Sequence, residues 1–208
     1  MKKIILGTAI GACAAMLAMP ASAQWYIGAG VGQSSLGNSG GGFQAGALGQ
    51  VSVNGDDNKT SWKLLGGYQF TPIWGIEAQY TDLGSRNFSA TVVTGGATQS
   101  GSFNAYEYSI AGTGRYFFSG TPSGWFVHGK LGVTSINSDN VNFCFVGGCV
   151  ASGGGNKTNA VFGIGIGHVF NKNWSVKGGY ENFGKTDSGP NGNKATVDNV
   201  GINVMYSF

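Results

Sequence analysis

The chain has few charged residues and, after residue 23, no long apolar run. Only 10% of its 208 residues are Asp, Glu, Lys or Arg, against about 25% in a typical soluble domain. Residues 24–208 contain no stretch of about 20 apolar residues, which a transmembrane helix requires. Setting aside Lys2 and Lys3 leaves 10 of the 12 basic residues against 9 acidic ones. This balance argues against a nucleic-acid partner, which calls for a basic patch or stripe.

Cysteine and histidine are also scarce. The three cysteines are Cys13, Cys144 and Cys149, and the two histidines are His128 and His168. A metal site needs three or four such ligands close together, so we expect no metal and no cofactor. Nucleophilic catalysis needs a nucleophile beside an oriented base, and no motif supplies that pair, so we expect no catalytic residues. In a secreted protein, Cys144 and Cys149 are expected to form a disulfide, with two free thiols as the alternative.

The first 23 residues have the pattern of a cleaved signal peptide. Met1-Lys2-Lys3 is positively charged, an uncharged, mostly apolar run follows, and Ala21 and Ala23 supply the small residues of a cleavage site. We therefore expect the mature domain to be residues 24–208. The alternatives are a membrane-anchoring helix and a lipoprotein modified at Cys13.

The mature chain alternates with a period of two. Trp25, Ile27 and Val31 fall on one face of the first segment, while glycines occupy the other. Segments of this kind, each long enough to cross a bilayer as a tilted strand, recur eight times. They cover residues 24–34, 61–70, 74–83, 104–118, 125–136, 159–170, 174–183 and 196–208. Short connections alternate with long ones, so the sequence predicts an all-β fold, an eight-stranded antiparallel up-and-down transmembrane β-barrel.

The tryptophans support a membrane barrel. Trp25, Trp74, Trp125 and Trp174 each open an odd-numbered segment, and Trp62 opens the second segment at the other rim. Indole rings prefer the membrane interface, so these five residues are predicted to form an aromatic belt. A soluble β-sandwich, the alternative, gives no reason for a tryptophan at the start of every second strand.

Apart from the aspartates, which lie in loops or at strand ends near the long-loop rim, the acidic and basic residues within the segments share the inward parity. A charge facing lipid at the bilayer midplane costs roughly 2–4 kcal/mol, which explains this segregation. We expect a salt bridge between Glu77 and Arg115, whereas His168 falls on the outward parity. The network either plugs the lumen or gates a narrow ion path. The predicted lumen charge network comprises Lys63, Glu77, Glu107, Arg115, His128, Lys130, Lys177 and Glu181.

Residues 63–70 and 74–80 resemble the opening hairpin of OmpA-like and opacity-type outer-membrane β-barrel proteins, and residues 201–208 resemble their last strand. The resemblance implies a location in the outer membrane of a Gram-negative bacterium. It also implies that Ile202, Val204, Tyr206 and Phe208 are the signal read by the barrel-assembly machinery. It includes no peptidoglycan-binding domain, so no tether to the cell wall is expected.

The leading functional hypothesis is a structural or adhesive role through four long extracellular loops, because exposed connections are where contacts are made. The loops are predicted at residues 35–60, 84–103, 137–158 and 184–195. The expected partners are outer-membrane lipid and host or cell-surface ligands, and the chain is expected to be a monomer. A narrow porin-like channel for ions or small solutes is the alternative, and a lipid-modifying enzyme is a third hypothesis.

Overall fold

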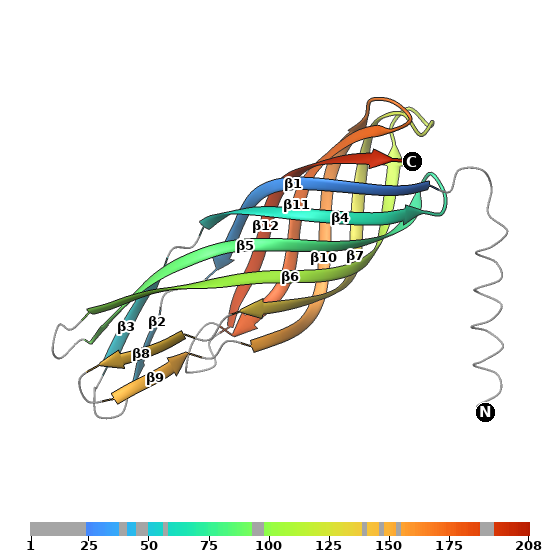
Figure 1. Ribbon diagram of the computed structural model, residues 1–208. Coiled ribbons are helices and arrows are strands. Elements are labelled where there is room, and N and C mark those ends of the chain that lie inside the picture. The colour runs from blue at the N-terminus through green and yellow to red at the C-terminus, as the bar shows by residue number, and fades with distance from the viewer. Residues whose placement is uncertain are drawn as a thin grey trace, which may run out of the picture.

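Eight long antiparallel strands close into a barrel in the computed structural model (Figure 1). The structure describes residues 24–37, 41–44, 50–55, 58–92, 98–138, 141–145, 148–152, 155–187 and 194–208. The predicted signal peptide lies outside these residues. The barrel strands are β1 (Gln24–Gly37), β4 (Asn58–Gln69), β5 (Trp74–Val92), β6 (Thr98–Phe117), β7 (Gly124–Ser138), β10 (Gly155–Val169), β11 (Trp174–Asp187) and β12 (Lys194–Ser207).

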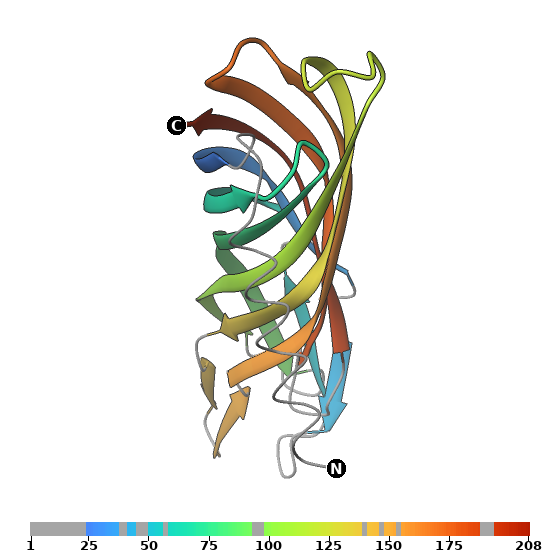
Figure 2. The same ribbon diagram turned by 90° about the vertical axis from the view of Figure 1, so that its right-hand side faces the viewer.

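Closure of the barrel depends on two pairings. β1 pairs with β12, which joins the two ends of the chain, and β5 pairs with β6. The order around the barrel is then β5-β4-β1-β12-β11-β10-β7-β6 and back to β5. Figure 2 shows the strands tilted around a common axis. The predicted fold class is confirmed. In the described part of the chain, no helix has the length and hydropathy of a membrane span.

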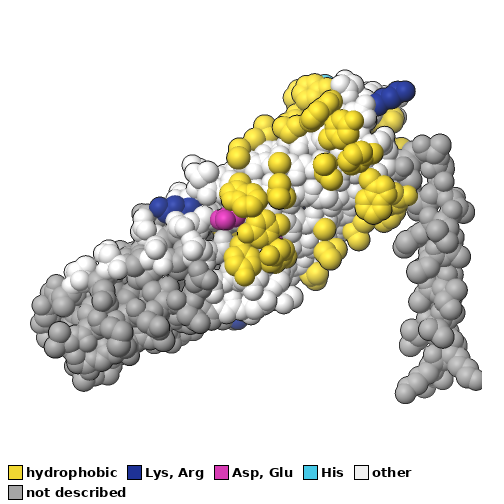
Figure 3. All heavy atoms as spheres, in the orientation of Figure 1, with side chains coloured by type: hydrophobic (Ala, Val, Ile, Leu, Met, Phe, Trp, Pro, Cys, Tyr) yellow, Lys and Arg dark blue, Asp and Glu magenta, His cyan; other side chains and the backbone are white. Residues whose placement is uncertain are grey.

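Apolar side chains face outward and charged side chains face inward, which is the reverse of a soluble protein. Large apolar residues such as Ile110 and Ile164 are 56% and 65% exposed, whereas Lys63 and Glu77, on the inward parity, are each 2% exposed. In the space-filling view the hydrophobic side chains cover the barrel wall, and the visible charged ones lie toward its ends (Figure 3). This surface is stable only against hydrocarbon, because the hydrophobic effect would drive it out of water.

The strands β5 and β6 extend well into the segment predicted as a loop at residues 84–103, and that part of the prediction is wrong. β5 and β6 remain paired from Ser85 with Asn104 to Thr91 with Thr98. Serine, threonine and asparagine suggested turns, but here they pair side by side across the strands, with Oγ atoms of Ser89 and Ser100 3.3 Å apart. Polar residues on an exposed face let a hairpin continue into water.

Four short strands occur in the other long connections at the same end of the barrel. β2 (Gly41–Gln44) pairs with β3 (Gln50–Gly55), and β3 pairs with the far part of β5. β8 (Val141–Phe145) and β9 (Gly148–Ser152) form a separate hairpin. β2, β3 and the ends of β5 and β6 therefore make one sheet that projects beyond the barrel, which we call the projecting sheet (Figure 1).

The two halves of the barrel are related by a pseudo-two-fold axis. Trp25 in β1 recurs as Trp125 in β7, and Trp74 in β5 recurs as Trp174 in β11, each at an interval of 100 residues. In the sheet order β1 and β7 are four strands apart, as are β5 and β11, so each pair faces across the axis.

A matching β-bulge in β5 and β11 extends this symmetry. The register shifts after Asp82 in β5 and after Asn182 in β11. Gly84 and Gly184 have φ angles of 82° and 80°, which only glycine adopts readily. Their N–H groups donate to the Oδ1 atoms of Asp82 and Asn182, at 2.8 and 3.0 Å. The bulges are thus built by a short Asx-type turn in each half.

Candidate functional site

The lumen is filled in three layers, with charged side chains between two apolar clusters. The cluster near the short turns consists of Tyr26, Leu65, Phe117, Phe126 and Met205. The cluster toward the long connections consists of Leu36, Leu83, Ala105, Ala111, Ile136, Val161, Phe183, Ala195 and Val197. Inward-facing glycines make room for these bulky groups. A Cβ on Gly167, for example, would lie 2.3 Å from the Phe126 ring.

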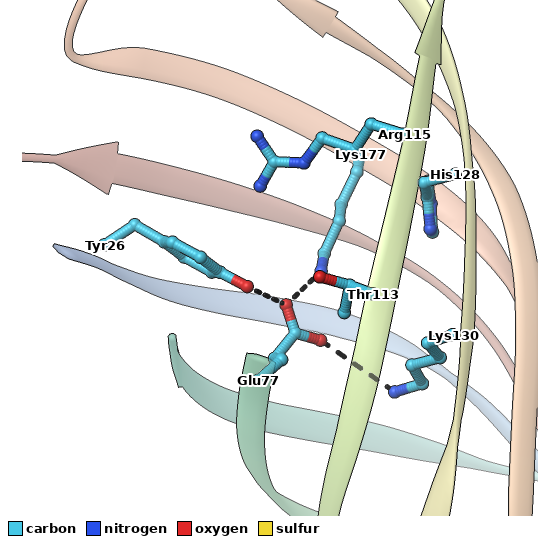
Figure 4. A pocket seen from close by; sticks show the side chains of 7 residues that line it. All are labelled: Tyr26, Glu77, Thr113, Arg115, His128, Lys130 and Lys177. Carbon is cyan, nitrogen blue, oxygen red and sulfur yellow. Dashed lines mark hydrogen bonds and ion pairs between the residues drawn. The ribbon is translucent and has the colours of Figure 1, made fainter. Parts of the chain in front are cut away.

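Glu77 is the centre of the charged layer (Figure 4). Its Oε2 atom accepts hydrogen bonds from the hydroxyl of Tyr26, at 2.9 Å, and from the ammonium of Lys177. Its Oε1 atom lies 4.0 Å from the ammonium of Lys130. A carboxylate removed from water requires such partners, because an unpaired buried charge is very costly.

A second carboxylate, Glu181, lies one level higher and is held by two lysines. Lys63 Nζ lies 2.5 Å from its Oε2 atom, and Lys130 Nζ lies 2.8 Å from its Oε1 atom. Lys130 therefore joins the two levels, since it contacts Glu181 and approaches Glu77. These charges come from β4, β5, β7 and β11, so the network ties together opposite sides of the barrel.

Glu107 is held by neutral donors. The amide of Gln79 and the hydroxyl of Thr81 donate to its Oε1 atom, both at 2.7 Å, and the hydroxyl of Thr134 donates to Oε2 at 2.9 Å. The charge-based reading of the sequence missed Gln79, Thr81, Thr134 and the hydroxyl of Tyr26. All four lie on the inward parity, so the alternation alone could have placed them in the lumen.

The predicted salt bridge between Glu77 and Arg115 is wrong. The β5–β6 register places Glu77 opposite Ala111, while the backbone N–H of Arg115 donates to the carbonyl of Ile73 at 2.8 Å. The two side chains therefore start at different heights. Adjoining barrel strands are staggered, so equal counts from the rim do not give equal heights.

Arg115 lies against aromatic rings. Its guanidinium carbon is 5.5 Å from the ring centroids of Tyr26 and Phe126, within the range of a cation–π contact. His128 faces the same region of the lumen, whereas His168 lies between Trp125 and Phe170 on the outside, with centroids 4.9 and 4.8 Å away. The histidines are thus on opposite sides of the barrel wall.

The cavity among these side chains is very small. It has a volume of about 10 Å³ and is lined by the seven residues drawn in Figure 4. That is the space of a single water molecule. On either side the lumen is filled by buried groups such as Phe126 and Phe183, each 0% exposed.

Aromatic side chains mark the two rims of the apolar belt. At the short-turn rim Trp25 contacts Tyr68, and Trp174 contacts Tyr206, at centroid distances of 4.8 and 5.0 Å. At the other rim Trp62 contacts Tyr80 at 5.3 Å. The outward residues change from apolar to polar beyond this second rim, where the projecting sheet begins.

The two remaining sets of predicted site residues lie at the C-terminal end of the chain and in the β8–β9 hairpin. Ile202, Val204 and Phe208 are exposed at the closing strand, and their role in assembly stays a prediction. Cys144 and Cys149 are directly opposite each other in the backbone register of β8 and β9. The disulfide also stays a prediction.

An apolar wall, a charge-filled lumen and a closed ladder of strands together define an integral membrane β-barrel. The chain matches the family described as "outer membrane protein beta-barrel domain" over residues 5–208, and it belongs to that family. It is therefore a protein of the bacterial outer membrane, as the resemblance noted above implied. A comparison with curated protein sequences found no match.

Several solved structures share this fold at low sequence identity. Ail, the attachment invasion locus protein of Yersinia pestis, solved in complex with the heparin analogue sucrose octasulfate, has a TM-score of 0.52 and 16% identity. The match covers 90% of this chain and 99% of that one. OprG from Pseudomonas aeruginosa has a TM-score of 0.59 and 15% identity, over 90% and 97% of the two chains. Neisserial surface protein A has a TM-score of 0.53 and 13% identity, over 90% and 99%.

Proposed function

We propose that this protein is a sealed, non-enzymatic membrane anchor that presents the projecting sheet to molecules outside the cell. The observation that carries the proposal is the continued pairing of β5 and β6 beyond the outer aromatic rim, from Ser85 to Thr91. Seven paired residues at a rise of ~3.4 Å each extend the hairpin by about 24 Å. A transport pore has no need of such an extension, whereas a contact surface does.

The outward face of this extension suits contact with polar surfaces. Ser85, Ser89 and Thr91 are hydrogen-bonded to the residues opposite them on β6, so their hydroxyls are held in a regular row. A rigid row of donors and acceptors binds with less loss of conformational entropy than a mobile loop does. Ail, named for attachment and invasion, shares this architecture, which supports the same class of role.

The filled lumen favours an anchor over the alternative of a narrow channel. An eight-stranded barrel is just wide enough for its side chains to fill it. Here buried rings close the lumen on both sides of the ion pairs, and the cavity between them is about 10 Å³. We therefore assign the lumen charges to holding the barrel together.

Adhesion of whole bacteria tests the proposal. Residues 86–103 are replaced by a two-residue hairpin turn, which removes the extension and leaves the barrel strands intact. We expect bacteria with this variant to lose attachment to cultured epithelial cells. A matched control shortens the β11–β12 connection at residues 188–193 and should retain attachment. Equal attachment by the 86–103 variant and the unaltered protein would contradict the role of the projecting sheet.

Conductance in a planar bilayer tests the sealed lumen separately. The inserted barrel should be silent, and Glu77→Ala should remain silent because the two apolar clusters are unchanged. Steady openings in the unaltered protein that change with Glu77→Ala would favour the channel.

A further inference from the structure

The lipid-facing wall carries a groove where β6 and β7 meet. Its volume is about 540 Å³, and Gly112, Gly114 and Gly129 lie between the side chains of Trp74 and Leu131. We call this feature the glycine groove. The other lining residues are Gly75, Thr113, Lys130 and Gly163. Thr113 and Lys130 also line the lumen cavity (Figure 4). The floor of the groove is therefore the backbone of the barrel wall, which separates it from the lumen.

Packing inside the barrel does not account for two of these glycines. A Cβ added to Gly132 would lie 2.1 Å from the carbonyl oxygen of Ile110, so that glycine is required by its neighbours. A Cβ on Gly112 or Gly129 would meet its nearest atom only at 3.8 Å. A side chain would fit at either position. The lack of a side chain at these two positions keeps the groove open on the lipid side.

The other half of the barrel fills the equivalent position. The β12–β1 seam pairs Ile202 with Val31 and Val204 with Ala29. The β6–β7 seam pairs Gly112 with Leu131 and Gly114 with Gly129 in the same arrangement. Isoleucine, valine and alanine on one side of the pseudo-two-fold axis thus correspond to three glycines on the other. The fold itself accepts a filled wall here, so the groove is a property of this sequence.

We propose that the glycine groove binds one acyl chain of a phospholipid from the periplasmic leaflet. Gly114 is opposite Trp74 in the register, and Trp74 opens β5 at the short-turn rim, so the groove lies in that half of the apolar belt. This rim is opposite the predicted extracellular loops, which makes it the periplasmic one. Bulk hydrocarbon that left the hollow empty would lose dispersion contacts along its whole floor. One extended chain lying in the groove regains those contacts.

A second copy of the protein fits the groove less well. A stable protein interface buries roughly 1,200–2,000 Å², whereas the hollow is bounded by Trp74 and Leu131 and spans only parts of four strands. Exposed, bulky side chains such as Val133 and Ile164 stand close by on β7 and β10 and would hold another barrel away. A single flexible chain has no such obstacle.

The test fills the groove with residues from the other half of the barrel. The variant Gly112→Ile/Gly129→Ala copies Ile202 and Ala29, and both new Cβ atoms have room. Gly66→Ile is the matched control, because Gly66 also faces outward with its nearest atom at 3.8 Å but does not line the groove. Each protein is placed in nanodiscs that contain a phospholipid with a photoactivatable group on its acyl chain. Cross-links are then mapped by mass spectrometry.

We expect strong cross-linking to β6 and β7 in the unaltered protein and in Gly66→Ile. In the filled variant the yield should fall about tenfold, equivalent to ~1.4 kcal/mol. An unchanged yield in the filled variant would overturn the proposal, and so would cross-links spread evenly around the barrel of the unaltered protein. A dimer that the filled variant abolishes would identify a second copy as the occupant and overturn it equally. Should the filled variant fail to insert, Gly129→Ala alone makes the same comparison with a smaller expected loss.

Discussion

The ion pair between Glu77 and Lys177 makes a quantitative prediction about stability. Glu77 is 2% exposed, and Lys177 is 6% exposed. At an effective dielectric constant of about 20, unit charges 4 Å apart interact by about 4 kcal/mol. Glu77→Gln keeps an oxygen for the Tyr26 hydroxyl but removes the charge, and it leaves Lys177 buried without its carboxylate. We expect this substitution to lower the free energy of unfolding by about 3–5 kcal/mol.

A double-mutant cycle isolates the pair. Lys177→Met should also destabilise the barrel. The double variant should lose less than the sum of the two, with a coupling energy of about 1.5–3 kcal/mol. The measurement is urea unfolding of the barrel refolded into lipid vesicles, followed by the fluorescence of its five tryptophans.

Arg115 supplies the internal control for this cycle. It lies against the rings of Tyr26 and Phe126 and reaches Glu77 only through their shared contact with Tyr26, so the coupling of Glu77→Gln to Arg115→Met should be clearly weaker than its coupling to Lys177→Met. Coupling of Glu77 to Arg115 as strong as its coupling to Lys177 would refute the reasoning. Additivity of Glu77 and Lys177 would refute it as well.

Three further predictions concern the wall, a bulge and the β8–β9 hairpin. Ile110 faces lipid, so Ile110→Lys should lower the free energy of unfolding by about 2–4 kcal/mol. Ser102 lies on the same face of β6 beyond the aromatic rim, so Ser102→Lys should change it by no more than about 0.5 kcal/mol in the same assay. Equal losses in the two variants would contradict the assignment of this face to lipid. Gly84→Ala should cost about 1–3 kcal/mol, because φ is 82° and the new Cβ would lie 2.7 Å from the carbonyl of Thr60, and an unchanged urea midpoint would count against this. Mass spectrometry of the non-reduced protein should find Cys144 and Cys149 joined, and two alkylatable thiols would disprove the disulfide.

The architecture was predictable because a membrane barrel leaves a strong sequence pattern. Alternation, tryptophans at the strand starts and inward charges all follow from one requirement, that lipid touches only apolar side chains. The charged residues that face the lumen were equally predictable, since the alternation alone places Lys63 and Glu181 inside.

The contacts within the lumen were less predictable. The alternation of side chains shows whether a residue faces the lumen or the lipid. It does not give the position of that residue along the barrel axis, which depends on the stagger between strands. For this reason Glu77 was assigned to Arg115, although its partner is Lys177, which reaches it across the lumen from β11. The projecting sheet was missed for another reason. Residues such as Ser89 and Ser100 favour turns on average, and only their pairing across two strands stabilises them in a hairpin.

The pseudo-two-fold axis has a consequence for how the barrel could be divided. Glu77 and Lys177 occupy equivalent positions in the two halves, yet they carry opposite charges. Two copies of the first half, closed around the same axis, would bring two carboxylates together there, and two copies of the second half would bring two ammonium groups together. If the chain is cut in the turn between β6 and β7, we expect the two four-stranded fragments to associate with each other in preference to themselves. The lumen charges therefore favour pairing of the two unlike halves over pairing of either half with a copy of itself.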